Sequence, residues 1–261
     1  MNPMPSTRAK DYFEFLAEIG MTKHYGSMEA TRELIDLCHI GSGQIVLDVG
    51  CGVGATPSFI ANKTDCHVIG LDLVERMLEK SRERAINEGV LELVEFLAGN
   101  GQKLPFTDDC FDAVIMESVN VFFSDKLAPI REYIRVTRPG GYVGFTEMTW
   151  LQPPYPKVEN AFRRAAFATA LNAAGWIDLL KEAGLQRVTG NAYQINVPVE
   201  SKGRIERYGR WNLLKTILKT LVSVLTDKKS RSFINDGMSG VSRDLLNVVG
   251  YGVYAGQKSM S

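Results

Sequence analysis

Short apolar runs alternate with amphipathic stretches along the first half of the chain. Runs typical of buried strands occupy residues 45–49, 67–73, 94–99, 111–117 and 142–148. Helical periodicity between them covers about 56–62, 74–87 and 125–137. Strands that alternate with helices at this spacing form a parallel sheet with right-handed crossovers. The pattern therefore predicts an α/β fold with a doubly wound sheet and ligands at the carboxyl ends of the strands.

Further elements are expected on both sides of this alternation. Two helices, 11–19 and 27–38, precede the first strand, and the polar loop 22–26 between them is a candidate to lie over the ligand. The later chain predicts helices at 158–171 and 175–183, a sixth strand at 187–197 and a terminal strand at 248–257.

About fifty residues, 198–247, separate the last two predicted strands. Within them an apolar stripe recurs at helical spacing: Leu213, Leu214, Ile217, Leu218, Leu221, Val222 and Leu225. Between Lys202 and Arg231, nine basic residues face two acidic ones, a net charge of about +7. An insertion of this length in a compact domain is usually a lid or a binding element. Three interpretations stay open. The segment could be a lid whose apolar face, with Leu214, Leu218 and Leu221, lines the acceptor pocket. It could instead be a basic amphipathic helix on an anionic membrane, or a dimer contact.

The composition narrows the class of protein. The 261 residues suit one α/β domain with an elaboration, and Lys plus Arg equals Asp plus Glu at 30 each, which leaves no overall nucleic-acid footprint. Four scattered cysteines indicate neither a disulfide scaffold nor a zinc site, and no metal is expected. No apolar run approaches the roughly 20 residues that span a bilayer, so a cytoplasmic protein is expected, with peripheral membrane contact as the variant.

The first predicted strand runs into a glycine turn that carries an acidic residue. Gly50 and Gly52 have the small-residue spacing of a dinucleotide loop, but Asp48 would repel a pyrophosphate there. S-adenosylmethionine (SAM) carries an ammonium and a sulfonium, which a nearby carboxylate stabilises. Asp72 ends the second strand, 24 residues downstream, where a carboxylate can accept both ribose hydroxyls. The loop therefore predicts a SAM site, which disfavours an NAD-linked dehydrogenase.

These motifs occur in a characteristic order. After Asp48 and Asp72 come Asn100-Gly101-Gln102 ahead of Leu-Pro-Phe, and Arg138-Pro-Gly-Gly opens the fifth strand. In this order the chain resembles the class I SAM-dependent methyltransferases, specifically the small-molecule branch that includes quinone C-methyltransferases. The resemblance implies a Rossmann-like fold with seven strands, the last of them antiparallel. It also implies three regions: N-terminal helices covering the cofactor site (1–40), a methyltransferase core (41–197 and 248–261) and an inserted helical cap (198–247).

The resemblance assigns the cofactor contacts residue by residue. Asp48, Gly50, Cys51 and Gly52 would hold the methionyl part of SAM, and Asp72 the ribose. The resemblance also implies that Leu73 packs on the adenine ring. Asn100, Gly101 and Gln102 would then lie by the adenine amino group. The family usually has Asp where this chain has Asn100, and an Asn side chain keeps an acceptor for that amino group.

Four side chains are candidates for the chemistry around the methyl group. Methyl transfer from a sulfonium mainly needs alignment and a dry pocket, with a base only where the nucleophile holds a proton. Glu117 and Glu147 end the fourth and fifth strands, at the edge where ligands bind, although strand-end carboxylates can also be merely solvated. His24 is a candidate base, and Tyr25 could close over the sulfonium with its ring, while both also suit plain packing. Candidate pocket aromatics are Phe122, Phe123, Tyr155, Trp176, Tyr208 and Trp211.

The sequence therefore predicts a SAM-dependent methyltransferase that releases S-adenosylhomocysteine. We expect a small, apolar or amphipathic acceptor such as an isoprenoid or aromatic compound, and no nucleic-acid partner. Two alternatives remain: a non-catalytic SAM-binding regulatory or assembly protein, and a methyltransferase that acts on a membrane lipid. The oligomeric state is left open.

Overall fold

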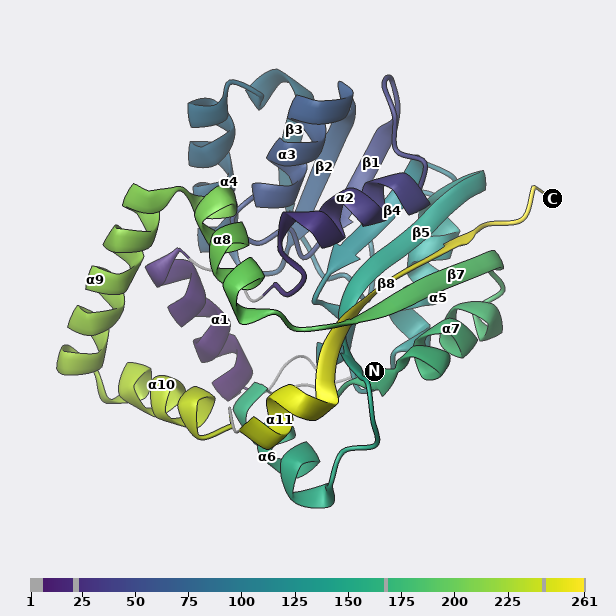
Figure 1. Cartoon of the computed structure of the whole chain (residues 1–261). Helices are drawn as coiled ribbons and strands as arrows, with labels where there is room; N and C mark the ends of the chain where they lie inside the picture. Colours follow the sequence, from purple (N-terminus) through teal and green to yellow (C-terminus); the bar gives the residue numbers. More distant parts are fainter. Residues whose placement is uncertain (1–6, 21–23, 167–168, 241–242, 261) are drawn as a thin grey trace.

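The structure is a computed structural model that describes residues 7–20, 24–166, 169–240 and 243–260. One eight-stranded sheet forms its centre, with the strand order β3-β2-β1-β4-β5-β8-β7 and β6 paired to β5 (Figure 1). The strands are β1 (Ile45–Val49), β2 (His67–Asp72), β3 (Val94–Ala98), β4 (Phe111–Glu117), β5 (Thr137–Trp150), β6 (Leu171–Asn172), β7 (Gln186–Gln194) and β8 (Val249–Gln257). The helices of the core are α2 (Ser27–Leu37), α3 (Ala55–Thr64), α4 (Glu75–Glu88), α5 (Leu127–Val136) and α7 (Ala173–Glu182).

The predicted doubly wound α/β fold is confirmed. Strands β1 to β5 pair in parallel, and β8 runs antiparallel to both β5 and β7. The sheet differs from the expected seven strands by β6, which has two residues and pairs with the end of β5. The order reverses between β1 and β4, because β2 and β3 lie on one side of β1 and β4 on the other. A cleft at the carboxyl ends of the strands is expected at such a switch point.

The central strands are apolar throughout because both faces of the sheet are covered. Val46 of β1 and Ile115 of β4 pack with residues of α2, α3 and α4 on one face. Their neighbours Leu47 and Val114 pack with residues of α5 and α7 on the other face. Successive strand residues point to opposite faces, so a strand buried on both sides needs continuous apolar sequence.

The helix predicted at 158–171 is shorter than expected. It is α6 (Pro156–Ala166), and Leu171 lies instead in β6. Asn172 then caps α7, because its side chain accepts a hydrogen bond from the backbone N–H of Gly175 at 2.8 Å. An Asn at this position satisfies a free N–H of the first turn, which explains why α7 begins directly after it, at Ala173.

Residues 197–240 and 243–248 contain four helices that lie beside the sheet. They are α8 (Val197–Tyr208), α9 (Arg210–Thr226), α10 (Lys228–Gly240) and α11 (Arg243–Val248). Figure 1 shows α8 beside α2, and α1 (Thr7–Ile19) between α9 and the sheet. No helix among the described residues is long and apolar enough to cross a membrane.

Candidate cofactor and acceptor site

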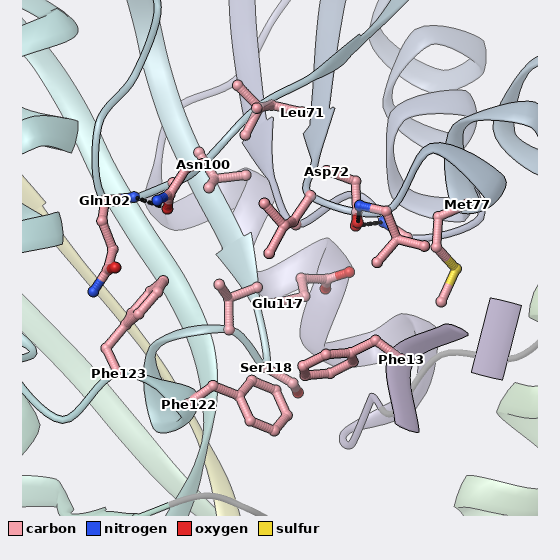
Figure 2. A pocket seen from close by; sticks show the side chains of 18 of the residues that line it. Phe13, Leu71, Asp72, Met77, Asn100, Gln102, Glu117, Ser118, Phe122 and Phe123 are labelled. Carbon is pink, nitrogen blue, oxygen red and sulfur yellow. Dashed lines mark hydrogen bonds between the residues drawn. The ribbon is translucent and has the colours of Figure 1, made fainter. Parts of the chain in front are cut away.

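A cavity of about 330 Å³ opens at the carboxyl ends of β1, β2 and β4 (Figure 2). One part is lined by Gly50, Gly52, Asp72, Leu73, Asn100 and Glu117, which come from the strand ends and the loops after them. The other part is lined by apolar side chains, among them Phe13 and Leu16 of α1. The cavity lies at the switch point of the sheet, where the fold predicts a ligand.

The glycine loop after β1 approaches its neighbours too closely for a side chain. The backbone N–H groups of Gly50 and Cys51 donate to the carbonyl of Leu71, at 2.6 and 3.1 Å. Gly50 has φ of +76°, and a Cβ there would meet Cγ2 of Val119 at 2.5 Å. Both the left-handed backbone and the lack of space favour glycine, and they leave the backbone of the loop open to the cavity.

Asp72 is held in one orientation by the backbone around it. One carboxylate oxygen accepts a hydrogen bond from Gly52 N–H and the other from Val74 N–H, each at 2.9 Å (Figure 2). Burial raises the pKa of Asp72, and these N–H groups oppose that rise. Each oxygen retains a second acceptor position. The carboxylate is therefore able to receive a pair of hydroxyl groups from a ligand in the cavity.

The turn after β3 forms another wall of the cavity. Oδ1 of Asn100 accepts a hydrogen bond from the backbone N–H of Gln102 at 2.9 Å, and both residues line the cavity with Gly101 between them (Figure 2). The amide oxygen that the sequence suggested for adenine thus also shapes the turn. Leu73 lines the cavity with 41% of its surface exposed, which leaves an apolar face available for a ring.

Glu117 is buried in a cluster of hydrogen-bond donors. Its carboxylate accepts hydrogen bonds from the hydroxyls of Thr31, at 2.7 Å, and Thr56. Arg207 donates to Glu117 Oε2 at 3.2 Å. Burial by itself would raise the pKa of Glu117, but His24, then Arg207, and the two hydroxyls outweigh burial and lower the pKa to about 2. The side chain is therefore a stable anion in the cavity wall and a weak base.

Arg207 is the residue of this cluster that the sequence did not single out. It comes from α8, and its side chain is 7% exposed. It also donates to the hydroxyls of Thr31 at 2.9 Å and Thr56 at 3.3 Å. In the sequence it is one cation in a basic run, and no local pattern separates it from Arg204 or Arg210.

Asp48 lies behind the glycine loop and is 2% exposed. Burial raises its pKa well above the usual range, and the nearby carboxylates of Glu117 and Asp72 add to this effect. Three carboxyl groups thus share the region around the loop, opposed by Arg207. A ligand that brings positive charge into this region would be stabilised, whereas a pyrophosphate would be repelled. The residues present therefore fit SAM.

The apolar part of the cavity combines α1 with the turn after β4. Phe13 and Phe122 lie side by side in Figure 2, and their rings meet edge to face with centroids 5.0 Å apart. Met77, Val119 and Phe123 also line the cavity. Of these residues only Phe122 and Phe123 were predicted as candidate pocket aromatics. Phe13 and Met77 lie on amphipathic helices, where the sequence did not distinguish them from core residues.

Other predicted site residues lie outside the lining of this cavity. His24 is buried beside Glu117, 3.8 Å from its Oε1, and contacts the carbonyl of Ser27 at 2.9 Å through Nε2. Burial and then Arg207 lower the pKa of His24 to about 4, so it is neutral near pH 7. Tyr25 packs against the main core, and Cys51 is 7% exposed behind the loop. Thr22 and Lys23 of the predicted covering loop lie outside the described residues.

Glu147 points away from the cavity. Oε1 accepts hydrogen bonds from the backbone N–H groups of Asn120 and Val121, in the turn behind Phe122. Burial raises the pKa of Glu147 to about 8, so the side chain holds a proton at pH 7. The strand-end argument placed Glu147 at the correct edge of the sheet, but the turn after β4 separates it from the cavity lining.

The expectation that the stripe of the insertion lines the pocket is wrong. Leu214, Leu218 and Leu221 are 57%, 63% and 56% exposed, and the described residues that line the cavity include none of them. Of the other candidate aromatics, Trp176 is in the core and Tyr155 and Trp211 are 70% and 79% exposed. Among the described residues, no cluster of His, Cys, Asp and Glu side chains is suited to a metal ion.

Known proteins resemble this chain in sequence. Residues 47–145 match the family model described as a methyltransferase domain. An uncharacterized protein of Haemophilus influenzae is 29% identical over 84% of this chain and 89% of its own length. Phosphoethanolamine N-methyltransferase 1 of Arabidopsis thaliana is 30% identical over 60% of this chain, and the match spans only about a third of that enzyme (33%).

Solved structures share the fold at low sequence identity. The [4+2]-cyclase SpnF has a TM-score of 0.80 at 16% identity, covering 100% of this chain and 99% of its own. Geranyl diphosphate C-methyltransferase of Streptomyces coelicolor, in complex with S-adenosylhomocysteine, has a TM-score of 0.69 at 14% identity, covering 98% and 100%. Phosphoethanolamine N-methyltransferase 2 of Haemonchus contortus, in complex with SAM, has a TM-score of 0.71 at 16% identity, covering 97% and 57%. The domain match over residues 47–145 and the shared fold, with the acidic cavity at the glycine loop, together show a methyltransferase domain with the fold of the class I SAM-dependent enzymes.

Proposed function

We propose that the protein transfers the methyl group of SAM to a small apolar acceptor that lies against Phe13, Phe122 and Phe123. The observation that supports this proposal is the division of the cavity. Figure 2 shows Asp72 on one side of the cavity and Phe13 and Phe122 on the other, with Glu117 between them. An acidic part suits the cofactor and an apolar part suits an uncharged acceptor.

Each part of the cavity would hold a defined portion of the cofactor. Asp72 would accept the ribose hydroxyls, with Leu73 and the turn at Asn100 against the adenine. Glu117 and the buried Asp48 would stabilise the methionyl ammonium. Bound SAM supplies an electrophilic methyl group on a sulfonium. The protein's own contribution is then to align the acceptor and exclude water.

The lining favours an acceptor that is nucleophilic without a strong base. Asp72 and Glu117 are the titratable side chains among the described residues that line the cavity, and Glu117 has a pKa of about 2. His24 and Glu147 lie outside the lining. A group with such a low pKa is a poor proton acceptor near neutral pH. We therefore favour a carbon nucleophile, or an oxygen that ionises readily in water.

The lining also argues against an acceptor that carries a phosphate. No Lys or Arg side chain occurs among the described residues that line the cavity. Phosphate recognition in proteins usually relies on such cations or on helix N-termini. We therefore use phosphoethanolamine and geranyl diphosphate, for which relatives are named, as comparison substrates and do not expect them to be methylated.

The test has a binding step and a transfer step. Calorimetry should show that SAM and S-adenosylhomocysteine bind more tightly than NAD, and NAD binding tighter than SAM would refute the cofactor assignment. Methyl transfer from radiolabelled SAM is then compared for phosphoethanolamine, geranyl diphosphate and an uncharged isoprenoid hydroquinone. We expect transfer to the hydroquinone alone. Preferred methylation of phosphoethanolamine would show that the apolar part of the cavity was misread, and SAM binding without transfer to any acceptor would favour a non-catalytic role.

A further inference from the structure

Helix α9 packs on the protein through its polar side. Thr216 is 8% exposed, and its hydroxyl donates to the carbonyl of Ile19 at the end of α1, at 2.9 Å. Thr220 and Ser223, one and two turns further along, are also partly buried. Leu213 and Val224 are partly buried apolar residues of this side, and Leu213 contacts the cluster around Tyr12 and Phe15. This orientation is the reverse of an ordinary surface helix, which buries its apolar stripe.

The opposite side of α9 is an exposed apolar face, which we define as Trp211, Leu214, Leu218, Leu221, Val222 and Leu225. These residues recur at spacings of three and four, so they form one stripe along the helix. Their exposed fractions run from 52% at Val222 to 79% at Trp211. Figure 1 shows α9 at the edge of the molecule, with α1 between it and the sheet. A continuous apolar face of this kind marks an interaction site.

The charges on α9 identify the kind of partner. The helix carries Arg210, Lys215 and Lys219 and contains no acidic residue. All three are exposed, and within the described part of the chain they make no ion pair. Lys228, at the start of α10, is also exposed. The apolar face is therefore bordered by positive charge that the protein itself does not neutralise.

A second copy of the chain is a poorer partner than a lipid surface. A symmetric contact between two α9 helices would bring their lysines together, and like charges oppose such pairing. An anionic bilayer offers an apolar interior to the leucines and negative headgroups to the lysines. We propose that α9 docks the protein on the surface of an anionic lipid bilayer, with its apolar face in the headgroup region and its axis parallel to the membrane.

This docking does not depend on the methyl-transfer reaction, but it would serve it. Helix α1 contacts α9 and also lines the cavity with Phe13 and Leu16. Docking through α9 would therefore place the apolar part of the cavity near the membrane, where an apolar acceptor dissolves. The acceptor could then reach the cavity without crossing water.

The experiment measures sedimentation of the full chain with phosphatidylcholine vesicles that contain 30% phosphatidylglycerol. We expect binding at 0.05 M salt, at least tenfold weaker binding at 0.5 M, and little binding to pure phosphatidylcholine, because exposed charges are screened within about 10 Å at 0.1 M salt. The triple variant L214S/L218S/L221S and the double variant K215E/K219E should each reduce binding at least tenfold. Calorimetry with SAM on every variant shows that the fold is intact, because neither α9 face lines the cofactor cavity.

Matched substitutions elsewhere serve as controls. Ile86 on α4 is an apolar side chain with 62% exposure, and I86S should leave vesicle binding unchanged. The double variant K63E/K181E removes two exposed lysines from α3 and α7 and should weaken binding less than K215E/K219E. Three results would overturn the proposal: no vesicle binding at low salt, equal loss in the control variants, or light scattering that shows a dimer which L214S/L218S/L221S converts to a monomer. None of these results bears on SAM binding or methyl transfer, which are measured separately.

Discussion

Replacing Arg207 by methionine tests whether the ion pair between Arg207 of α8 and Glu117, at the end of β4, stabilises the fold. Methionine keeps much of the side-chain volume but removes every hydrogen bond to Glu117, Thr31 and Thr56. Glu117 is 6% exposed, so at pH 7, where the neighbouring His24 is neutral, its charge would lose the cationic partner Arg207 in a poorly solvated position. We expect Arg207→Met to lower the free energy of unfolding at pH 7.

The magnitude follows from two independent arguments. The pKa of Glu117 falls from 4.5 to about 2, which corresponds to about 3 kcal/mol at 1.36 kcal/mol per pKa unit. Breaking one side of a buried ion pair typically costs about 3 to 5 kcal/mol. Much of the lowering comes from His24, Thr56 and Thr31, which the substitution retains, so about 3 kcal/mol is an upper value from this first argument. We therefore expect a loss of about 3 kcal/mol, a large part of a typical domain's stability.

Urea unfolding followed by circular dichroism measures this loss. Two comparisons test whether it comes from the charge of Arg207. Arg204→Met removes an exposed cation from the same helix and should change stability by less than about 0.5 kcal/mol. In an E117Q background, Arg207→Met should cost at least about 1 kcal/mol less than in the wild type, because the charge it pairs with is gone. Equal costs for the Arg204 and Arg207 variants, or an unchanged cost in the E117Q background, would refute the reasoning.

The pH dependence has a defined sign. The folded-state pKa of Glu117 lies below its ordinary value of 4.5, so the ionised carboxylate stabilises the fold above that pH and the stabilisation is lost as the pH falls toward about 2. The stability difference between wild type and Arg207→Met should therefore be full at pH 7 and shrink below pH 4.5. A difference that is constant from pH 7 to pH 3.5 would assign the effect to packing.

Three further predictions concern the cavity. Asp72→Ala should weaken SAM binding about ten- to a hundredfold, from losing about 1.5 to 3 kcal/mol of hydrogen bonding to the ribose, and unchanged affinity by calorimetry with an intact fold would exclude that role. Gly50→Ala should cost more stability than Gly43→Ala, because both have positive φ (+76° and +78°) but only a Cβ at Gly50 meets a neighbour, Val119, at 2.5 Å; equal costs in urea unfolding would show that the loop shifts freely. Phe122→Ala should reduce acceptor turnover at least tenfold in the radiolabel assay while SAM affinity changes less than threefold, and the opposite division would place Phe122 on the cofactor.

The local pattern of the sequence determined the sheet and its glycine loop. Alternating strands and helices specify a parallel sheet, and the ends of neighbouring parallel strands meet at one edge. Asp72 and the loop at Gly50 therefore had to lie close together, as the hydrogen bond from Gly52 to Asp72 shows. These inferences rest on short-range geometry that any chain of this pattern shares.

The partners of Glu117 were decided by tertiary structure alone. Arg207 lies 90 residues away in the chain, and only the packing of α8 against α2 brings its guanidinium to the end of β4. Glu147 is a second example. The sequence placed it at the correct edge of the sheet, but only the tertiary structure shows that the turn after β4 covers it.

Helix α9 separates most clearly what the sequence determines from what the tertiary structure decides. The spacing of its leucines predicts an amphipathic helix, but periodicity does not say which face meets the protein. That choice depended on α1, whose carbonyl at Ile19 accepts the hydroxyl of Thr216 and so turns the polar face inward. Periodicity is a property of one helix, whereas the orientation of a helix is set by its neighbour. The sequence therefore specified the stripe, and the tertiary structure decided that it faces outward.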